Sequence, residues 1–91
     1  MKVVKFYADW CGPCQKYQNH WDAYVLQNED EEIEFIDVNV EKPGGAKYKK
    51  NVQISSIPLT VVFNEDLEMI RSEKGLLRHE QLKELIYGNE N

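Results

Sequence analysis

The sequence predicts an α/β domain in which a four-stranded mixed sheet is flanked by helices, with its elements in the order βαβαββα. Short runs rich in β-branched residues alternate with segments whose apolar residues recur at helical spacing, a pattern typical of parallel strand pairs. The polar turn Asn64-Glu65-Asp66 separates the last two apolar runs and indicates a hairpin. The first two strands should therefore pair in parallel, and the last two should pair antiparallel.

The first half of the chain predicts a strand, a helix and a second strand. Residues 2–7 form a short, mostly apolar strand, and an acidic loop at 28–32 ends the helix that follows it. The residues expected on one face of this helix are Cys14, Tyr17, Trp21, Tyr24 and Val25. Residues 33–40 have the β-branched content and the apolar runs of the next strand.

The second half predicts a short helix, a hairpin and a closing helix. Pro43-Gly44-Gly45 marks a turn before a helix over 46–50. The hairpin strands are expected at 59–63 and 67–71. From residue 76 onward a final helix places Leu82, Leu85 and Ile86 on one stripe.

The length and composition indicate one domain over residues 1–91. A chain of this size buries roughly 60–65% of the surface that its unfolded form exposes, so its core is modest. Trp21, Tyr24, Phe35 and Phe63 are the large side chains expected in that core.

The charge pattern argues against nucleic acid and membrane partners. The formal net charge is −5, and acidic residues gather at 29–32, so phosphate backbones and anionic lipid surfaces would be repelled. The basic run 47–50 is too short for a nucleic-acid footprint and is typical of a solvated helix face. No long apolar segment suggests a transmembrane helix or a signal peptide, and we expect a cytoplasmic protein.

The two cysteines of the chain lie in Trp10-Cys11-Gly12-Pro13-Cys14, where the first strand should turn into a helix. Unsatisfied N–H groups and the dipole at a helix start stabilise a thiolate, so Cys11 should ionise more readily than a free cysteine. Cys14, one turn later, can close onto Cys11 as a disulfide.

Such a cysteine pair occurs in catalytic dithiol sites, in structural disulfides and in zinc sites. A permanent staple is unusual in a reducing compartment. Zinc requires further ligands, and His20 and His79 do not match a zinc-finger spacing, so we predict no metal site.

The chain resembles the thioredoxin family over essentially its whole length. Trp-Cys-Gly-Pro-Cys after Phe-Tyr-Ala-Asp is the active-site motif of that family, and Ser55-Ser56-Ile57-Pro58 falls where the family has its cis-proline. Gly75 and the closing Leu-Lys-Glu-Leu also fall at family spacing. The resemblance implies a thioredoxin fold and a thiol–disulfide oxidoreductase that reduces protein disulfides without a bound cofactor.

The resemblance also implies a role for each residue of the site. Cys11, at an exposed helix start, would attack a substrate disulfide, and the shielded Cys14 would resolve the mixed disulfide. The Ile57–Pro58 peptide bond would be cis and lie beside Cys11. The residues expected to contact substrate are Trp10, Gly12, Pro13, Ile57 and Pro58.

The implied partners are disulfide-containing proteins and a flavoprotein like thioredoxin reductase that draws on NADPH, although regeneration by glutathione stays open. A monomer is expected. Two other functions also stay open: a glutaredoxin-like electron donor, and a thioredoxin-fold binding subunit whose cysteines are not catalytic.

The sequence departs from the family in two ways that affect the site. The family's leading strand and helix are missing before residue 2, which would leave 33–40 as an edge strand. Lys5 stands where the family usually has a buried aspartate, and Asp37 stands where it usually has a lysine. Because an unpaired buried charge is costly, we predict that Lys5 and Asp37 form the same ion pair with its ends exchanged. The Lys5 ammonium would then lie beneath Cys14 and favour its thiolate, with Asp37 as the proton acceptor, so both are candidate catalytic residues.

Overall fold

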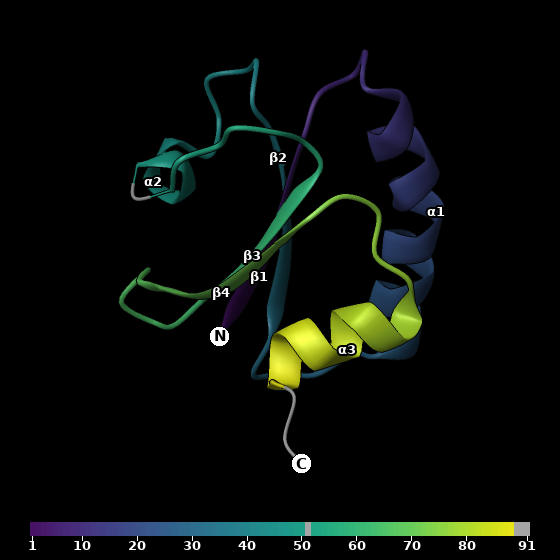
Figure 1. Ribbon diagram of the computed structural model, residues 1–91. Coiled ribbons are helices and arrows are strands. Elements are labelled where there is room, and N and C mark those ends of the chain that lie inside the picture. Colours follow the sequence, from purple (N-terminus) through teal and green to yellow (C-terminus); the bar gives the residue numbers. More distant parts are fainter. Residues whose placement is uncertain (51, 89–91) are drawn as a thin grey trace.

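The computed structural model describes residues 1–50 and 52–88, so residues 51 and 89–91 of the predicted domain lie outside the described part. Its elements follow the predicted order (Figure 1). They are β1 (Lys2–Tyr7), α1 (Gly12–Gln27), β2 (Glu34–Asn39), α2 (Ala46–Lys49), β3 (Leu59–Phe63), β4 (Met69–Lys74) and α3 (His79–Tyr87).

The strands form one mixed sheet in the order β2-β1-β3-β4. β1 pairs in parallel with β2, whereas β3 pairs antiparallel with both β1 and β4. The predicted mixed four-stranded sheet is confirmed, and β2 lies at one edge of it. Figure 1 shows α1 and α3 together on one side of the sheet and α2 on the other.

Alternation along β1 sends its side chains to opposite faces of the sheet. Val3 packs in the core beneath α1 and α3, whereas Val4 and Phe6 pack in the core on the α2 side. Lys5 shares the α1 face with Val3, which places a fully buried charged side chain between the sheet and α1.

Most of the predicted core is confirmed. Trp21, Tyr24 and Phe63 are buried, and Phe35 is partly buried against the same core. Phe35 lies on the edge strand β2, where only one neighbouring strand covers it.

β2 is one residue shorter at each end than the predicted strand 33–40, and α2 ends one residue before the predicted residue 50. The differences in β4 and α3 are larger. Instead of 67–71, β4 covers Met69–Lys74, because the Asn64 side chain accepts hydrogen bonds from the backbone N–H groups of Asp66 and Glu68 at 2.9 and 3.0 Å. These bonds hold a loop in which Leu67 takes a positive φ of 59°. The last helix begins at His79 and not at residue 76, because Gly75 has a φ of 86° and ends the strand with a turn.

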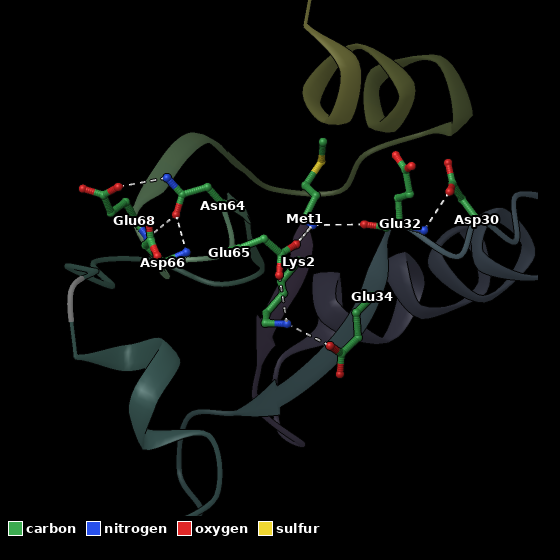
Figure 2. A network of polar contacts seen from close by, with 9 residues as sticks. All are labelled: Met1, Lys2, Asp30, Glu32, Glu34, Asn64, Glu65, Asp66 and Glu68. Carbon is green, nitrogen blue, oxygen red and sulfur yellow. Dashed lines mark hydrogen bonds and ion pairs between the residues drawn. The ribbon is translucent and has the colours of Figure 1, made fainter.

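A polar network joins the start of β1 to its neighbours (Figure 2). The amino group of Met1 donates to the Glu32 carbonyl at 3.0 Å and also pairs with the Glu65 carboxylate in the β3–β4 turn. Lys2 Nζ lies 3.0 Å from Glu34 Oε1 on β2. Hydrogen bonding to the amino group lowers the pKa of Glu65. The network therefore links the beginning of β1 to β2 and to the hairpin.

α1 has 16 residues and α3 has nine, and both bury one face against the sheet. Over residues 1–50 and 52–88, no helix combines the length and apolar character that crossing a membrane requires.

Candidate active site

The cysteine pair lies where the chain leaves β1 and enters α1, as the sequence predicts. Cys11 is the N-cap of α1, and Pro13 occupies the first turn, where its missing N–H leaves no helix bond unmade. The Cys14 backbone N–H donates to Cys11 Sγ at 3.2 Å. Cys11 and Cys14 form a disulfide, with Cα atoms 5.2 Å apart. The helix start thus presents an N–H group and its positive dipole end to the sulfur of Cys11.

The expected difference in exposure between the two cysteines is not found. Cys11 and Cys14 are each 3% exposed, so the prediction of an exposed Cys11 is wrong for the disulfide form. Its sulfur is covered because Cys11 packs with Ala8 and Cys14 in a small cluster that Ile57 also contacts. Neighbouring Trp10, by contrast, is 68% exposed.

The loop before β3 lies beside the disulfide. Cys11 Sγ is 3.9 Å from the carbonyl oxygen of Ile57, and the Ile57–Pro58 peptide bond is cis. Pro58 is buried, and its carbonyl accepts a hydrogen bond from the Gly75 N–H at 2.8 Å. The fold therefore brings together two motifs that are separated by more than 40 residues in the chain.

Each cysteine borders a pocket of its own. The Cys11 pocket, of about 460 Å³, is lined by Trp10, Cys11, Gly12, Pro13, Val40, Ile54, Ser55, Ser56 and Ile57. The Cys14 pocket, of about 390 Å³, is lined by Tyr7, Ala8, Asp9, Cys14, Gln15, Gln18 and Asn19. The two sets share no residue, so each cysteine borders a different part of the surface.

The structure groups four of the five predicted substrate-contacting residues around the Cys11 pocket. These are Trp10, Gly12, Pro13 and Ile57. Pro58 does not line the pocket; it lies buried behind Ile57. Sequence reasoning missed Val40 and Ile54, which lie after β2 and before β3 and carry no motif that would mark them.

The predicted ion pair between Lys5 and Asp37 is present. The two residues are register partners across β1 and β2, and Lys5 Nζ lies 3.3 Å from Asp37 Oδ2. Asp37 Oδ1 also accepts a hydrogen bond from Trp21 Nε1 at 2.8 Å. The acidic and basic ends are therefore exchanged relative to the family pattern described above.

The Lys5 ammonium is enclosed by aromatic rings. Its Nζ lies 5.1 Å from the ring centre of Tyr7, 5.9 Å from that of Tyr17 and 5.5 Å from that of Trp21. The electron-rich faces of such rings attract a cation. Burial nevertheless lowers the pKa of Lys5, and the nearby Asp37 carboxylate opposes this shift.

Gln18 connects the Lys5 ammonium to the Cys14 pocket. Lys5 Nζ donates a hydrogen bond to Gln18 Oε1, and Gln18 lines the pocket together with Cys14. Sequence reasoning missed Gln18, although its position four residues after Cys14 places it on the same side of the helix.

The chemistry of this site rests on sulfur. In the part of the chain that the structure describes, no group of three or more His, Cys, Asp or Glu side chains is arranged to hold a metal ion. A cysteine pair that closes at a helix N-terminus, beside a loop with a cis-proline, defines a thiol–disulfide oxidoreductase.

Comparisons with known proteins agree with this class. Residues 1–87 match the family model described as thioredoxin. The chain therefore belongs to the thioredoxin family.

Two relatives show how the chain compares in length. The chain is 33% identical to a thioredoxin of Mycoplasmoides gallisepticum, over 92% of this chain and 79% of the relative. It is also 36% identical to mitochondrial thioredoxin-2 of Schizosaccharomyces pombe, over 76% of this chain and 49% of the relative.

Solved structures show the same fold. StoA from Bacillus subtilis superposes with a TM-score of 0.77 at 20% identity, covering 92% of this chain and 80% of that one. The oxidised thioredoxin from Plasmodium falciparum superposes with a TM-score of 0.69 at 25% identity, covering 92% and 75% respectively.

Proposed function

We propose that this thioredoxin-family protein reduces disulfide bonds in other proteins, with Cys11 as the attacking thiol and Cys14 as the resolving thiol. The observation that supports this assignment is the separation of the two pockets. Cys11 borders the pocket that exposed Trp10 and Ile57 also line, whereas Cys14 borders the other pocket. A substrate disulfide that enters the Cys11 pocket meets Cys11 first.

The first step joins Cys11 to the substrate. In the reduced protein, the N–H of Cys14 and the dipole of α1 support a Cys11 thiolate. This thiolate attacks one sulfur of the substrate disulfide, a Cys11–substrate bond forms, and the other substrate sulfur leaves as a thiolate that takes up a proton.

The second step releases the substrate. The Cys14 thiolate attacks Cys11 Sγ, the Cys11–Cys14 bond forms, and the bond between Cys11 and the substrate breaks. The leaving sulfur carries off the electron pair and is protonated, so two electrons pass from the dithiol to the substrate. In this proposal the Lys5 ammonium stabilises the Cys14 thiolate. The partly exposed Asp37 carboxylate accepts the proton that Cys14 loses.

The lining of the Cys11 pocket indicates which substrates it favours. It consists of apolar side chains, glycine and two serines, with no charged residue among them. An extended segment with apolar or small residues beside its cysteine would fit, and the Ile57 carbonyl at the rim would accept a backbone hydrogen bond from it.

Regeneration requires an outside source of two electrons. A flavoprotein reductase that uses NADPH is the proposed donor, with glutathione as the other route. Both cysteines of the chain belong to the site, so no structural disulfide has to survive in a reducing compartment such as the cytoplasm. One chain also carries both cysteines and the Ile57–Pro58 loop, which is consistent with a monomer acting alone.

Insulin reduction, followed by turbidity in the presence of dithiothreitol, tests the proposal. The parent should accelerate precipitation, and Cys11→Ser should abolish the acceleration. Cys14→Ser should accumulate a mixed disulfide with insulin, because attack persists while resolution is lost. If the parent shows no rate that depends on Cys11, a binding subunit is the better assignment. If the parent reduces glutathione mixed disulfides and not insulin, a glutaredoxin-like donor is better.

A further inference from the structure

Gln18 occupies a position that the two-step mechanism leaves without a role. It lies on α1 at the border between the Cys14 pocket and the buried ammonium of Lys5. Its Oε1 accepts a hydrogen bond from Lys5 Nζ, and its Nε2 donates to Asp22 Oδ1 at 2.7 Å. The bond to Asp22 fixes the direction of the amide, because an amide that offers its NH₂ group to a carboxylate turns its oxygen the other way.

The same amide stands next to the resolving cysteine. Gln18 follows Cys14 by four residues, and side chains at this spacing are neighbours on one side of a helix. Tyr7 lines the pocket as well, and its ring centre lies 5.1 Å from Lys5 Nζ. The Lys5 ammonium therefore contacts two residues, Gln18 and Tyr7, that line the same pocket as Cys14.

Two acceptors hold the ammonium from opposite elements. Asp37 on β2 lies 3.3 Å from Lys5 Nζ, and Gln18 approaches from α1. Without Gln18, the attraction of Asp37 would hold the Lys5 ammonium toward the edge strand β2 and farther from Cys14. The other groups that face Lys5 are Tyr7 of β1, Tyr17 and Trp21 of α1, Asp22 of α1 through Gln18, and Thr60, its register partner on β3.

We propose that Gln18 is a positioning residue for the resolving step, because it holds the Lys5 ammonium on the Cys14 side of the ion pair. This inference rests on the proposed function, in which Cys14 attacks Cys11. Lys5 keeps its protons throughout and stabilises the Cys14 thiolate through its charge. The proton of Cys14 passes to Asp37, as assigned above, and the electron pair follows the path already described.

The test measures Cys14 directly. In a Cys11→Ser background, the rate of Cys14 alkylation by iodoacetamide is followed by mass spectrometry between pH 6 and pH 11. Gln18→Met keeps the length of the side chain and removes its acceptor oxygen. Gln18→Met should raise the proton-dissociation midpoint of Cys14 by about half a pH unit. Below that midpoint, the fraction of Cys14 present as thiolate should then be roughly threefold lower.

Gln15→Met is the matched control. Gln15 lines the same pocket, but its amide donates to the Asp9 carbonyl at 2.9 Å. The midpoint should therefore stay unchanged in Gln15→Met. Equal shifts in the two variants, or no shift in Gln18→Met, would overturn the proposal.

A double-mutant cycle separates positioning from packing. In a Lys5→Met background, Gln18→Met should shift the midpoint no further, because no ammonium remains to be positioned. A shift of the same size in both backgrounds would show that Gln18 acts without Lys5. If Lys5→Met does not fold, the comparison of Gln18→Met with Gln15→Met decides, since both side chains lie at the border of one pocket. The insulin assay on the parent is independent of this titration, so a failure of the positioning role can be distinguished from a failure of the proposed function.

Discussion

Lys5 and Asp37 face each other across the parallel strands β1 and β2, but solvent reaches only one of them. The Lys5 side chain is fully buried, whereas the Asp37 side chain is 39% exposed. Water can therefore solvate the carboxylate when the pair is broken, but it cannot solvate the ammonium. Lys5 depends on Asp37 more than Asp37 depends on Lys5.

Removal of the Asp37 charge should destabilise the fold. Asp37→Asn leaves a buried ammonium without its counter-charge, and we expect a loss of about 1–3 kcal/mol in the free energy of unfolding, below the range for a fully buried pair because Asp37 is partly hydrated. Urea denaturation measures the loss. Glu34→Gln, on the exposed face of the same strand, is the control and should change stability little. Equal losses in both variants would contradict the asymmetry.

Lys5→Ala should act on one step of the reaction more than on the other. At neutral pH it should slow the release of the mixed disulfide more than the initial attack, because the ammonium lies near the pocket of Cys14 and away from that of Cys11. Rapid mixing with a fluorescent disulfide peptide separates the two steps. Lys2→Ala, at the far end of β1, should change neither, and an equal effect of Lys5→Ala on both steps would remove its assigned role.

Gly45→Ala should destabilise the start of α2. Gly45 has a φ of 74°, and an added Cβ would come within 2.8 Å of both γ-carbons of Val38. Strain and overpacking together predict a loss of about 2–4 kcal/mol. Gly44→Ala is the matched control, since its Cβ would meet no atom within 4 Å. Thermal unfolding of both variants checks the prediction, which fails if they melt at the same temperature.

Tyr17→Phe should change how stability depends on alkaline pH. Burial raises the pKa of Tyr17 above its ordinary value of 10.0, so the folded protein keeps a proton that the unfolded chain releases near pH 10. Stability contributed by Tyr17 is therefore lost as the pH rises above 10. Near pH 7 the variant should be less stable than the parent by about 1–2 kcal/mol, because the 2.8 Å hydrogen bond to Thr60 Oγ1 is lost.

Above pH 10 the difference in free energy of unfolding between the parent and Tyr17→Phe should become smaller by about 1.4 kcal/mol per pH unit. Urea unfolding of the parent and the variant between pH 7 and pH 11 measures it. Tyr87→Phe, which removes the hydroxyl of a half-exposed tyrosine, is the control. A constant difference between Tyr17→Phe and the parent would contradict the assignment.

Trp10→Ala should impair substrate binding with little effect on stability. Trp10 is 68% exposed and lines the Cys11 pocket, so its removal costs the fold within about 0.5 kcal/mol. We expect a several-fold rise in KM for insulin and little change for a small disulfide such as hydroxyethyl disulfide, which makes no use of the pocket rim. Leu26→Ala, at an exposed position near the C-terminal end of α1, should leave both KM values unchanged. Parallel losses with both substrates would place the role of Trp10 in the reaction and not in binding.

Local patterns were sufficient to predict the elements and their order. The strand at 2–7 and the strand at 59–63 agree with the structure residue for residue, because their apolar and β-branched residues suit the buried central strands β1 and β3. The ends of β4 and α3 could not be predicted this way. They depend on the Asn64 side chain, which organises the turn, and on the conformation of Gly75, and neither follows from hydrophobic periodicity.

Part of the site was likewise readable before the fold was known. The spacing of Cys11 and Cys14 indicated a closing pair at a helix start. The resemblance to the thioredoxin family marked Lys5 and Asp37 as the two positions of a buried pair, and the rule that buried charges need partners then predicted that Lys5 binds Asp37.

The tertiary structure alone decided how each sulfur is surrounded. It buries Cys11 as deeply as Cys14, assigns the two cysteines to different pockets, and places Gln18 between the Lys5 ammonium and the pocket of Cys14. These features arise from the packing of α1 against β1 and of the Ile57 loop against the helix start, which bring distant residues together. The sequence pattern indicates which groups need a partner. Which of several candidate partners lies close enough is determined only when the helices and strands pack together.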